Sequence, residues 1–149
     1  MSRIKDLIRK NLSNIPGWRT NRKIVVIESD DWGSVRIRDK EAYEALKQKG
    51  LNVDDKRYDQ VDTLESNEDL ELLFDVLNSV KDKNGKSAKF TPLCLLGNPD
   101  FEKIKDGEFK EYHFQPLTDT IKGYPNSKRI LDFWKEGAQT QIFVPQLHG

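Results

Sequence analysis

Two adjacent aspartates, Asp30 and Asp31, follow a run of β-branched residues and form the most chemically suggestive pair in the chain. Two carboxylates this close repel each other, so one of them is driven to bind a proton unless a cation compensates the charge. A divalent ion held by one carboxylate removes this conflict and leaves the other carboxylate able to accept a proton. The pair therefore indicates metal-assisted hydrolysis as a candidate chemistry.

Three other residues extend this candidate site. His148 ends a later apolar run, and imidazole binds zinc and similar ions alongside carboxylates. Trp32 and Asn98 also stand at the ends of apolar runs, and we predict that both contact substrate. Each residue has an ordinary alternative: an Asp-Asp pair forms turns or helix caps, Trp32 packs in a core, and a terminal histidine lies in solvent.

Three predicted strands would bring these groups together. The run Lys23–Ser29 predicts a strand that is buried on both faces and stops just before Asp30. The second strand is Ala88–Leu96, interrupted by Pro92, and the third is Gln141–Leu147. Ligands of parallel sheets bind beyond the carboxyl ends of the strands, so the groups at these ends are expected to share one edge.

Helical spacing of apolar residues predicts the connections between the strands. One helix is expected to end near Gly50, and Ser66 with Asp69 resembles a capping box at the start of another. The predicted helices are 39–49, 67–80 and 127–138, and the predicted irregular segments are 50–65 and 101–124. The resulting order of strand, helices, strand, helix, strand favours an α/β fold with right-handed crossovers and a parallel sheet.

The N-terminal segment 1–12 predicts a basic amphipathic helix, with Ile4, Leu7, Ile8 and Leu12 on one face. Such a helix can lie on an anionic membrane. The simpler interpretation, which we adopt, is a helix that covers an opening of its own domain. We therefore divide the chain into residues 1–22, a helix and linker, and residues 23–149, an α/β domain.

Composition excludes several classes of protein. The chain has 25 basic and 25 acidic residues, so it lacks the net positive charge that supports nucleic-acid binding. The single cysteine, Cys94, rules out an internal disulfide framework and Cys-rich zinc sites, and it is expected to act as a small buried hydrophobe. Neither a signal peptide nor an apolar stretch long enough to span a bilayer is recognised, which predicts a cytoplasmic protein that does not associate with membranes.

These motifs resemble those of the polysaccharide deacetylases. The stretch 24–33 resembles the family's first motif, a strand ending in Thr-Phe-Asp-Asp-Gly, and is closest to a divergent bacterial branch that reads Glu-Ser-Asp-Asp-Trp-Gly. The stretch 144–149 looks like the beginning of the second motif, His-(Ser/Thr/Gly)-x-x-His. The resemblance extends over most of the chain, including residues 98–101 and 134–137.

The resemblance implies the N-terminal part of a distorted (β/α) barrel that removes acetyl groups from N- or O-acetylated saccharides with one divalent metal, often zinc. Carried over residue by residue, it makes Asp30 the general base, Asp31 the aspartate metal ligand and His148 the first of two histidine ligands. Ser29 and Trp32 replace the family's common Phe and Gly.

The second histidine and the later motifs of the family would lie beyond Gly149, so we expect a truncated member with weak metal affinity and little or no turnover. The alternative is a non-catalytic saccharide-binding or assembly module that uses an open sheet edge to form a homo-oligomer. A two-metal phosphoesterase ranks lower, because no Asp-x-Asp or His-x-Asp element is evident.

Overall fold

The computed structural model describes residues 2–13, 15–53 and 63–148. Most of the irregular segment expected at 50–65, including its charged stretch 54–57, lies outside these residues. The elements in chain order are α1 (Ser2–Ser13), β1 (Glu28–Trp32), α2 (Lys40–Gln48), α4 (Asn67–Ser79), β2 (Thr91–Cys94), β3 (Gly97–Pro99), α5 (Phe101–Asp106), β4 (Phe114–Pro116), α6 (Leu117–Thr120), η1 (Ile121–Gly123), η2 (Pro125–Ser127), α7 (Ile130–Thr140) and β5 (Gln146–Leu147).

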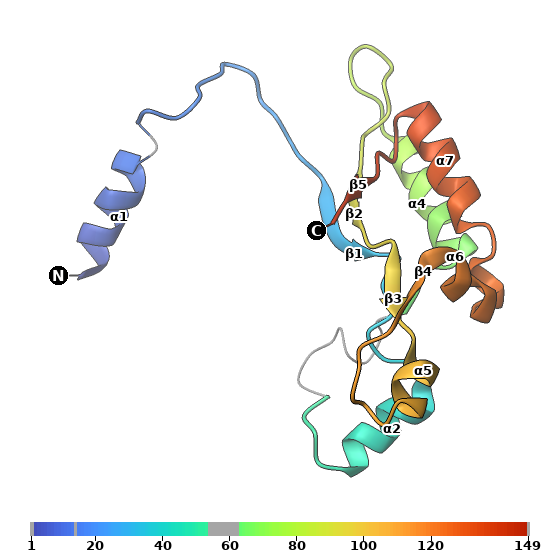
Figure 1. Cartoon of the computed structure of the whole chain (residues 1–149). Coiled ribbons are helices and arrows are strands. Elements are labelled where there is room, and N and C mark those ends of the chain that lie inside the picture. The colour runs from blue at the N-terminus through green and yellow to red at the C-terminus, as the bar shows by residue number, and fades with distance from the viewer. Residues whose placement is uncertain (1, 14, 54–62, 149) are drawn as a thin grey trace.

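A parallel three-strand sheet with the order β1-β2-β5 forms the centre of the molecule (Figure 1). Strand β2 lies in the middle, where Trp32 of β1 pairs with Cys94 and Leu147 of β5 pairs with the same residue from the other side. The predicted α/β class with parallel strands and crossover helices is therefore confirmed. Its assignment to a barrel stays a prediction.

The first strand differs from the prediction in position and burial. It comprises Glu28–Trp32, so both aspartates belong to the strand rather than following it. The preceding apolar run 24–27 lies outside the sheet and is exposed, with Val25 86% accessible. Only the carbonyl of Ile27 reaches β2, where it accepts a hydrogen bond from the Thr91 N–H at 2.9 Å. A strand buried on both faces was thus a wrong expectation.

The last predicted strand is also shorter than expected. Gln141 adopts a left-handed conformation (φ +59°) that ends α7, and β5 contains only Gln146–Leu147. Between them Phe143 forms a parallel bridge with Phe90. The preceding helix begins at Ile130 rather than at Ser127, and residues 125–127 form a separate 3-10 turn.

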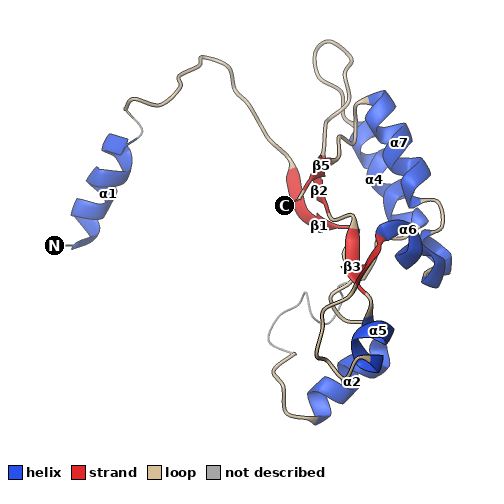
Figure 2. Ribbon diagram, viewed as in Figure 1, coloured by secondary structure: helices blue, strands red, loops and turns tan. Residues whose placement is uncertain are grey.

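Helices α4 and α7 lie together against one side of the sheet (Figure 2). Helix α4 has the predicted capping box: the Ser66 hydroxyl accepts from the Asp69 N–H, and the Asp69 carboxylate accepts from the Ser66 N–H. Helix α7 approaches the core at Gly137, where a Cβ atom would lie 2.5 Å from that of Phe143. The hydrophobic core comprises Val35, Leu64, Leu70, Phe74, Leu77, Phe90, Cys94, Leu117, Ile121, Ile130, Phe133, Trp134, Ile142 and Phe143.

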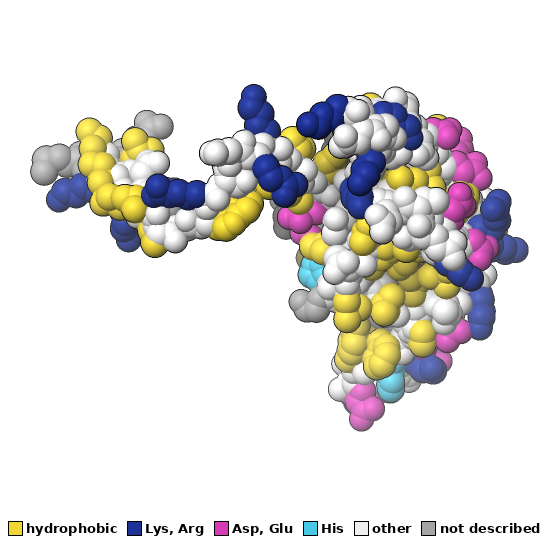
Figure 3. Space-filling model, turned by 90° about the horizontal axis from the view of Figure 1, so that it is seen from above, with side chains coloured by type: hydrophobic (Ala, Val, Ile, Leu, Met, Phe, Trp, Pro, Cys, Tyr) yellow, Lys and Arg dark blue, Asp and Glu magenta, His cyan; other side chains and the backbone are white. Residues whose placement is uncertain are grey.

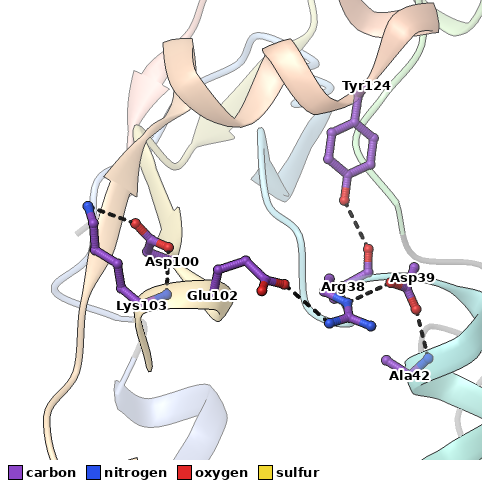
Figure 4. Close-up of polar contacts among 7 residues, drawn as sticks. All are labelled: Arg38, Asp39, Ala42, Asp100, Glu102, Lys103 and Tyr124. Carbon is purple, nitrogen blue, oxygen red and sulfur yellow. Dashed lines mark hydrogen bonds and ion pairs between the residues drawn. The ribbon is translucent and has the colours of Figure 1, made fainter. Parts of the chain in front are cut away.

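A smaller lobe contains α2, α5 and the antiparallel pair β3-β4. The segment 101–124, expected as a long loop with short elements, contains α5, β4, α6 and η1. Figure 4 shows the contacts that join this lobe. The Arg38 guanidinium contacts Asp39 at 2.6 Å and Glu102 of α5 at 3.4 Å, and the Tyr124 hydroxyl donates to the Arg38 carbonyl at 3.2 Å. Asp39 also caps α2 through the Ala42 N–H, and this bond, with the Arg38 contact, lowers the pKa of the Asp39 carboxyl.

Helix α1 stands apart from the sheet and its helices (Figure 1). Its apolar residues Ile4, Leu7, Ile8 and Leu12 are exposed, so it does not cover an opening of the domain as expected. Among the described residues, no helix is long and apolar enough to cross a membrane.

Candidate functional site

Asp31 and His148 meet at the carboxyl ends of β1 and β5. The Asp31 Oδ1 atom lies 3.9 Å from the His148 Nε2 atom, and both side chains are about one-third exposed, at 32% and 36%. The last residues of β2 separate the two strands, and the His148 N–H donates to the Cys94 carbonyl at 2.9 Å. Residues 117 positions apart in the chain are therefore brought together by the parallel sheet, as the sequence predicts.

The backbone of Asp31 is unusual. Its φ of +63° is in the left-handed region, and the β1-β2 register shifts between Ser29 and Trp32. Irregularities of this kind re-aim a side chain and are frequent next to active sites. The Asp31 Oδ2 atom contacts the guanidinium of Arg36, while Oδ1 faces His148. The carboxylate thus has one oxygen engaged by a cation and one directed to the imidazole.

Asp30 lies beside this pair in sequence, but its side chain makes no hydrogen bond or ion pair with the described residues. Its side chain is exposed on β1. The part of the chain that the structure describes contains no group of three His, Cys, Asp or Glu side chains that could hold a metal ion. The geometry consequently provides two candidate ligands, Asp31 and His148, and leaves the predicted role of Asp30 as a base untested.

Asn98 is buried, and Trp32 is partly buried against the hydrophobic core. The Trp32 ring packs edge-on against Phe90 and Phe143, with centroid distances of 5.3 Å to each. The buried Asn98 side chain accepts from the Val35 N–H at 2.7 Å and donates to the Gly33 carbonyl at 2.8 Å. These contacts give both residues a structural part in shaping the loop after Asp31, and their contact with a substrate stays a prediction.

Glu65 is a functional candidate that the sequence reasoning missed. Its Oε2 atom accepts the Gly33 N–H at 3.0 Å, from a segment 32 residues away. Together, Glu65 and Asn98 hold the N–H and the carbonyl of Gly33, two residues after Asp31. The only sequence signal was a carboxylate directly after the apolar Leu64, in a segment that we interpreted as a polar loop.

Burial raises the pKa of the Glu65 carboxyl, although the Gly33 N–H and the nearby Trp134 indole favour its charged form. Neither Glu65 Oε1 nor Trp134 Nε1 makes a hydrogen bond within the described part of the chain, and both atoms are buried. Burial, with a smaller contribution from the same carboxylate, raises the pKa of the Cys94 thiol to about 12. Cys94 is therefore an unreactive buried thiol, as expected.

A Glu65→Gln substitution tests this burial. Because the carboxyl pKa is raised in the folded protein, the folded state holds its proton more tightly, and wild-type stability falls as pH rises through that pKa. The free energy of unfolding of Glu65→Gln relative to wild type is expected to increase between pH 4 and pH 8. Urea unfolding across this range measures the trend, with Glu71→Gln on the exposed side of α4 as the control. A flat difference would show that Glu65 titrates as an exposed carboxylate does.

We compared the chain with known proteins. No protein-family model matches it, and neither does any curated protein or solved structure.

Proposed function

We propose that this chain carries part of the active site of a metal-dependent hydrolase that removes acetyl groups from saccharides. The single observation that supports this proposal most is the approach of Asp31 and His148 across the ends of parallel strands. The motif resemblance around Asp30, Asp31 and His148 provides the reaction class. The proposed substrate is an N- or O-acetylated sugar.

The separation of the two side chains is close to that of two ligands of one zinc ion. Zinc lies about 2.0–2.2 Å from nitrogen and oxygen ligands, and in its usual tetrahedral geometry two such ligand atoms lie about 3.3–3.6 Å apart. The 3.9 Å between Asp31 Oδ1 and His148 Nε2 is slightly longer, so a small side-chain movement would bring both atoms onto one ion. Catalytic zinc sites usually have three protein ligands. Since the described residues provide two, the affinity of this chain for zinc is expected to be weak.

A bound divalent ion would polarise the acetyl carbonyl and acidify water. Asp30, next to the ligand Asp31, is proposed to accept the proton from the attacking water. Arg36 is proposed to hold the Asp31 carboxylate in place, since it contacts the oxygen that faces away from His148. Glu65 and Asn98 would support the same loop through Gly33.

Isothermal titration with zinc chloride tests the ligand assignment. Loss of an outer-shell partner alone lowers metal affinity by about 10–100-fold, so Asp31→Ala and His148→Ala are each expected to lower it at least tenfold. Two matched controls come from the same chain. Asp30→Ala removes the neighbouring carboxylate, and His113→Ala removes the other histidine; both should retain wild-type affinity.

Zinc binding that is equal in wild type, Asp31→Ala and His148→Ala would contradict the proposed site. A chain that binds acetylated oligosaccharide without zinc, and retains that binding in Asp31→Ala, would instead favour the non-catalytic saccharide-binding module.

A further inference from the structure

The N-terminal arm, which we define as residues 2–23, exposes an apolar helix face. Helix α1 leaves Ile4, Leu7, Ile8 and Leu12 between 52% and 68% accessible, and Trp18, beyond the helix, is 79% accessible. The four aliphatic residues recur at helical spacing, so they form one continuous stripe along α1. Figure 3 shows apolar side chains in yellow and basic side chains in dark blue on the arm that projects from the body. The stripe is thus presented outward and packs against none of the described elements.

Charge is distributed very unevenly between the arm and the remainder of the chain. Residues 1–23 contain seven lysines and arginines and one acidic residue, Asp6. Because the whole chain has 25 residues of each sign, residues 24–149 have an excess of six acidic residues. A chain with zero net charge is therefore strongly polarised, with a basic arm and an acidic body.

We propose that this arm binds the surface of an anionic lipid membrane and holds the body on it. A helix with an apolar stripe and a basic polar face lies in the plane of the headgroups, with the stripe inserted between the acyl chains. Basic residues near an anionic surface each tighten binding about fivefold, and tryptophan favours the interfacial region. Lys5, Arg9 and Lys10 on α1 provide the basic face, and Arg19, Arg22 and Lys23 add to it.

The acidic body strengthens the choice of a membrane over a protein partner. An anionic surface attracts the arm and repels the body, so the molecule is oriented with its sheet away from the lipid. The arm offers a stripe and a diffuse charge, without a pocket for any particular side chain. This inference is independent of the proposed hydrolase activity and concerns residues outside that site.

Vesicle sedimentation tests the inference with the full chain. Vesicles of phosphatidylcholine are compared with vesicles in which about one third of the lipid is phosphatidylglycerol. Wild type is expected to bind the anionic vesicles at least tenfold more tightly and to lose most of this preference in molar salt, which shortens the Debye length to about 3 Å. An increase of helical circular dichroism is not required, because α1 is already helical.

Two double variants separate the contributions of basic charge and of apolar area to vesicle binding. Arg9→Glu with Lys10→Glu removes two of the arm's basic charges and should weaken binding at least roughly thirtyfold. Leu7→Gln with Leu12→Gln removes apolar area and should weaken it about tenfold or more. The matched controls lie on the body: Lys128→Glu with Lys135→Glu for charge, and Leu72→Gln with Val76→Gln for exposed apolar residues on α4. Both controls should bind as wild type does.

Three results would overturn the inference. The first is equal binding to neutral and anionic vesicles, or binding to neither. The second is binding that the charge variant loses and the apolar variant retains, since a basic segment alone would then suffice. The third is a concentration-dependent dimer in light scattering that high salt dissociates, without vesicle binding, because the arm would then pair with the acidic body of a second copy.

Discussion

Replacement of Phe143 with alanine is expected to lower the free energy of unfolding by about 3–5 kcal/mol. Phe143 is fully buried and lies at the centre of the aromatic cluster, with ring centroids 5.3 Å from Trp32, 5.7 Å from Phe74, 5.9 Å from Phe90 and 6.4 Å from Trp134. Truncation leaves a cavity between the sheet and α7. Domains are stable by only about 5–15 kcal/mol, so much of the folded margin would be lost.

Urea unfolding followed by tryptophan fluorescence measures this loss. Phe114→Ala is the matched control, because Phe114 is exposed on β4 and its truncation should change stability by less than about 0.5 kcal/mol. A loss in Phe143→Ala no larger than in Phe114→Ala would mean that the cluster is loosely packed. Phe143 also connects the core to the candidate site, because it packs against Trp32, which directly follows Asp31.

Helices with local signals were predictable from the sequence. The capping box of α4 lies within four residues, and Gly50 directly follows the C-cap of α2, where the sequence predicts that this helix ends. The start of β1 was not predictable in this way, because it depends on where β2 begins to pair. Phe90 hydrogen-bonds to the β5 side, through Ile142 and Val144, and only from Thr91 onward does β2 bond toward β1. The apolar run 24–27 therefore has no partner over most of its length.

The candidate site also contains one feature that the sequence predicts and others that it does not. The approach of Asp31 to His148 follows from a general rule about strand ends in parallel sheets, so residue types and strand order sufficed to predict it. The supporting contacts of Glu65 and Asn98 depend on a loop and a short antiparallel strand, whose placement no periodicity reveals. A buried carboxylate in a polar-looking segment is the kind of residue that such reasoning overlooks.

The Gly33→Ala substitution is expected to destabilise the protein by about 2–5 kcal/mol and to weaken zinc binding. Gly33 has a φ of +79°, which costs an alanine roughly 1–2 kcal/mol. Its new Cβ atom would also lie 2.7 Å from the Leu95 carbonyl oxygen and 3.3 Å from the Trp134 ring. Overpacking of this kind adds about 1–3 kcal/mol. The backbone must shift, and with it the Glu65 contact and the position of Asp31.

Gly50→Ala is the matched control that separates the cost of a positive φ from the cost of overpacking. Gly50 has nearly the same conformation, with a φ of +74°, but no atom of the described residues lies within 4 Å of its Cβ position. It should therefore lose only the conformational part, roughly 1–2 kcal/mol, and retain wild-type zinc affinity. Chemical denaturation and zinc titration of both variants give four values. Equal stability losses would show that the loop relaxes away from Leu95 without strain, whereas a zinc affinity unchanged in Gly33→Ala would show that this loop does not position Asp31.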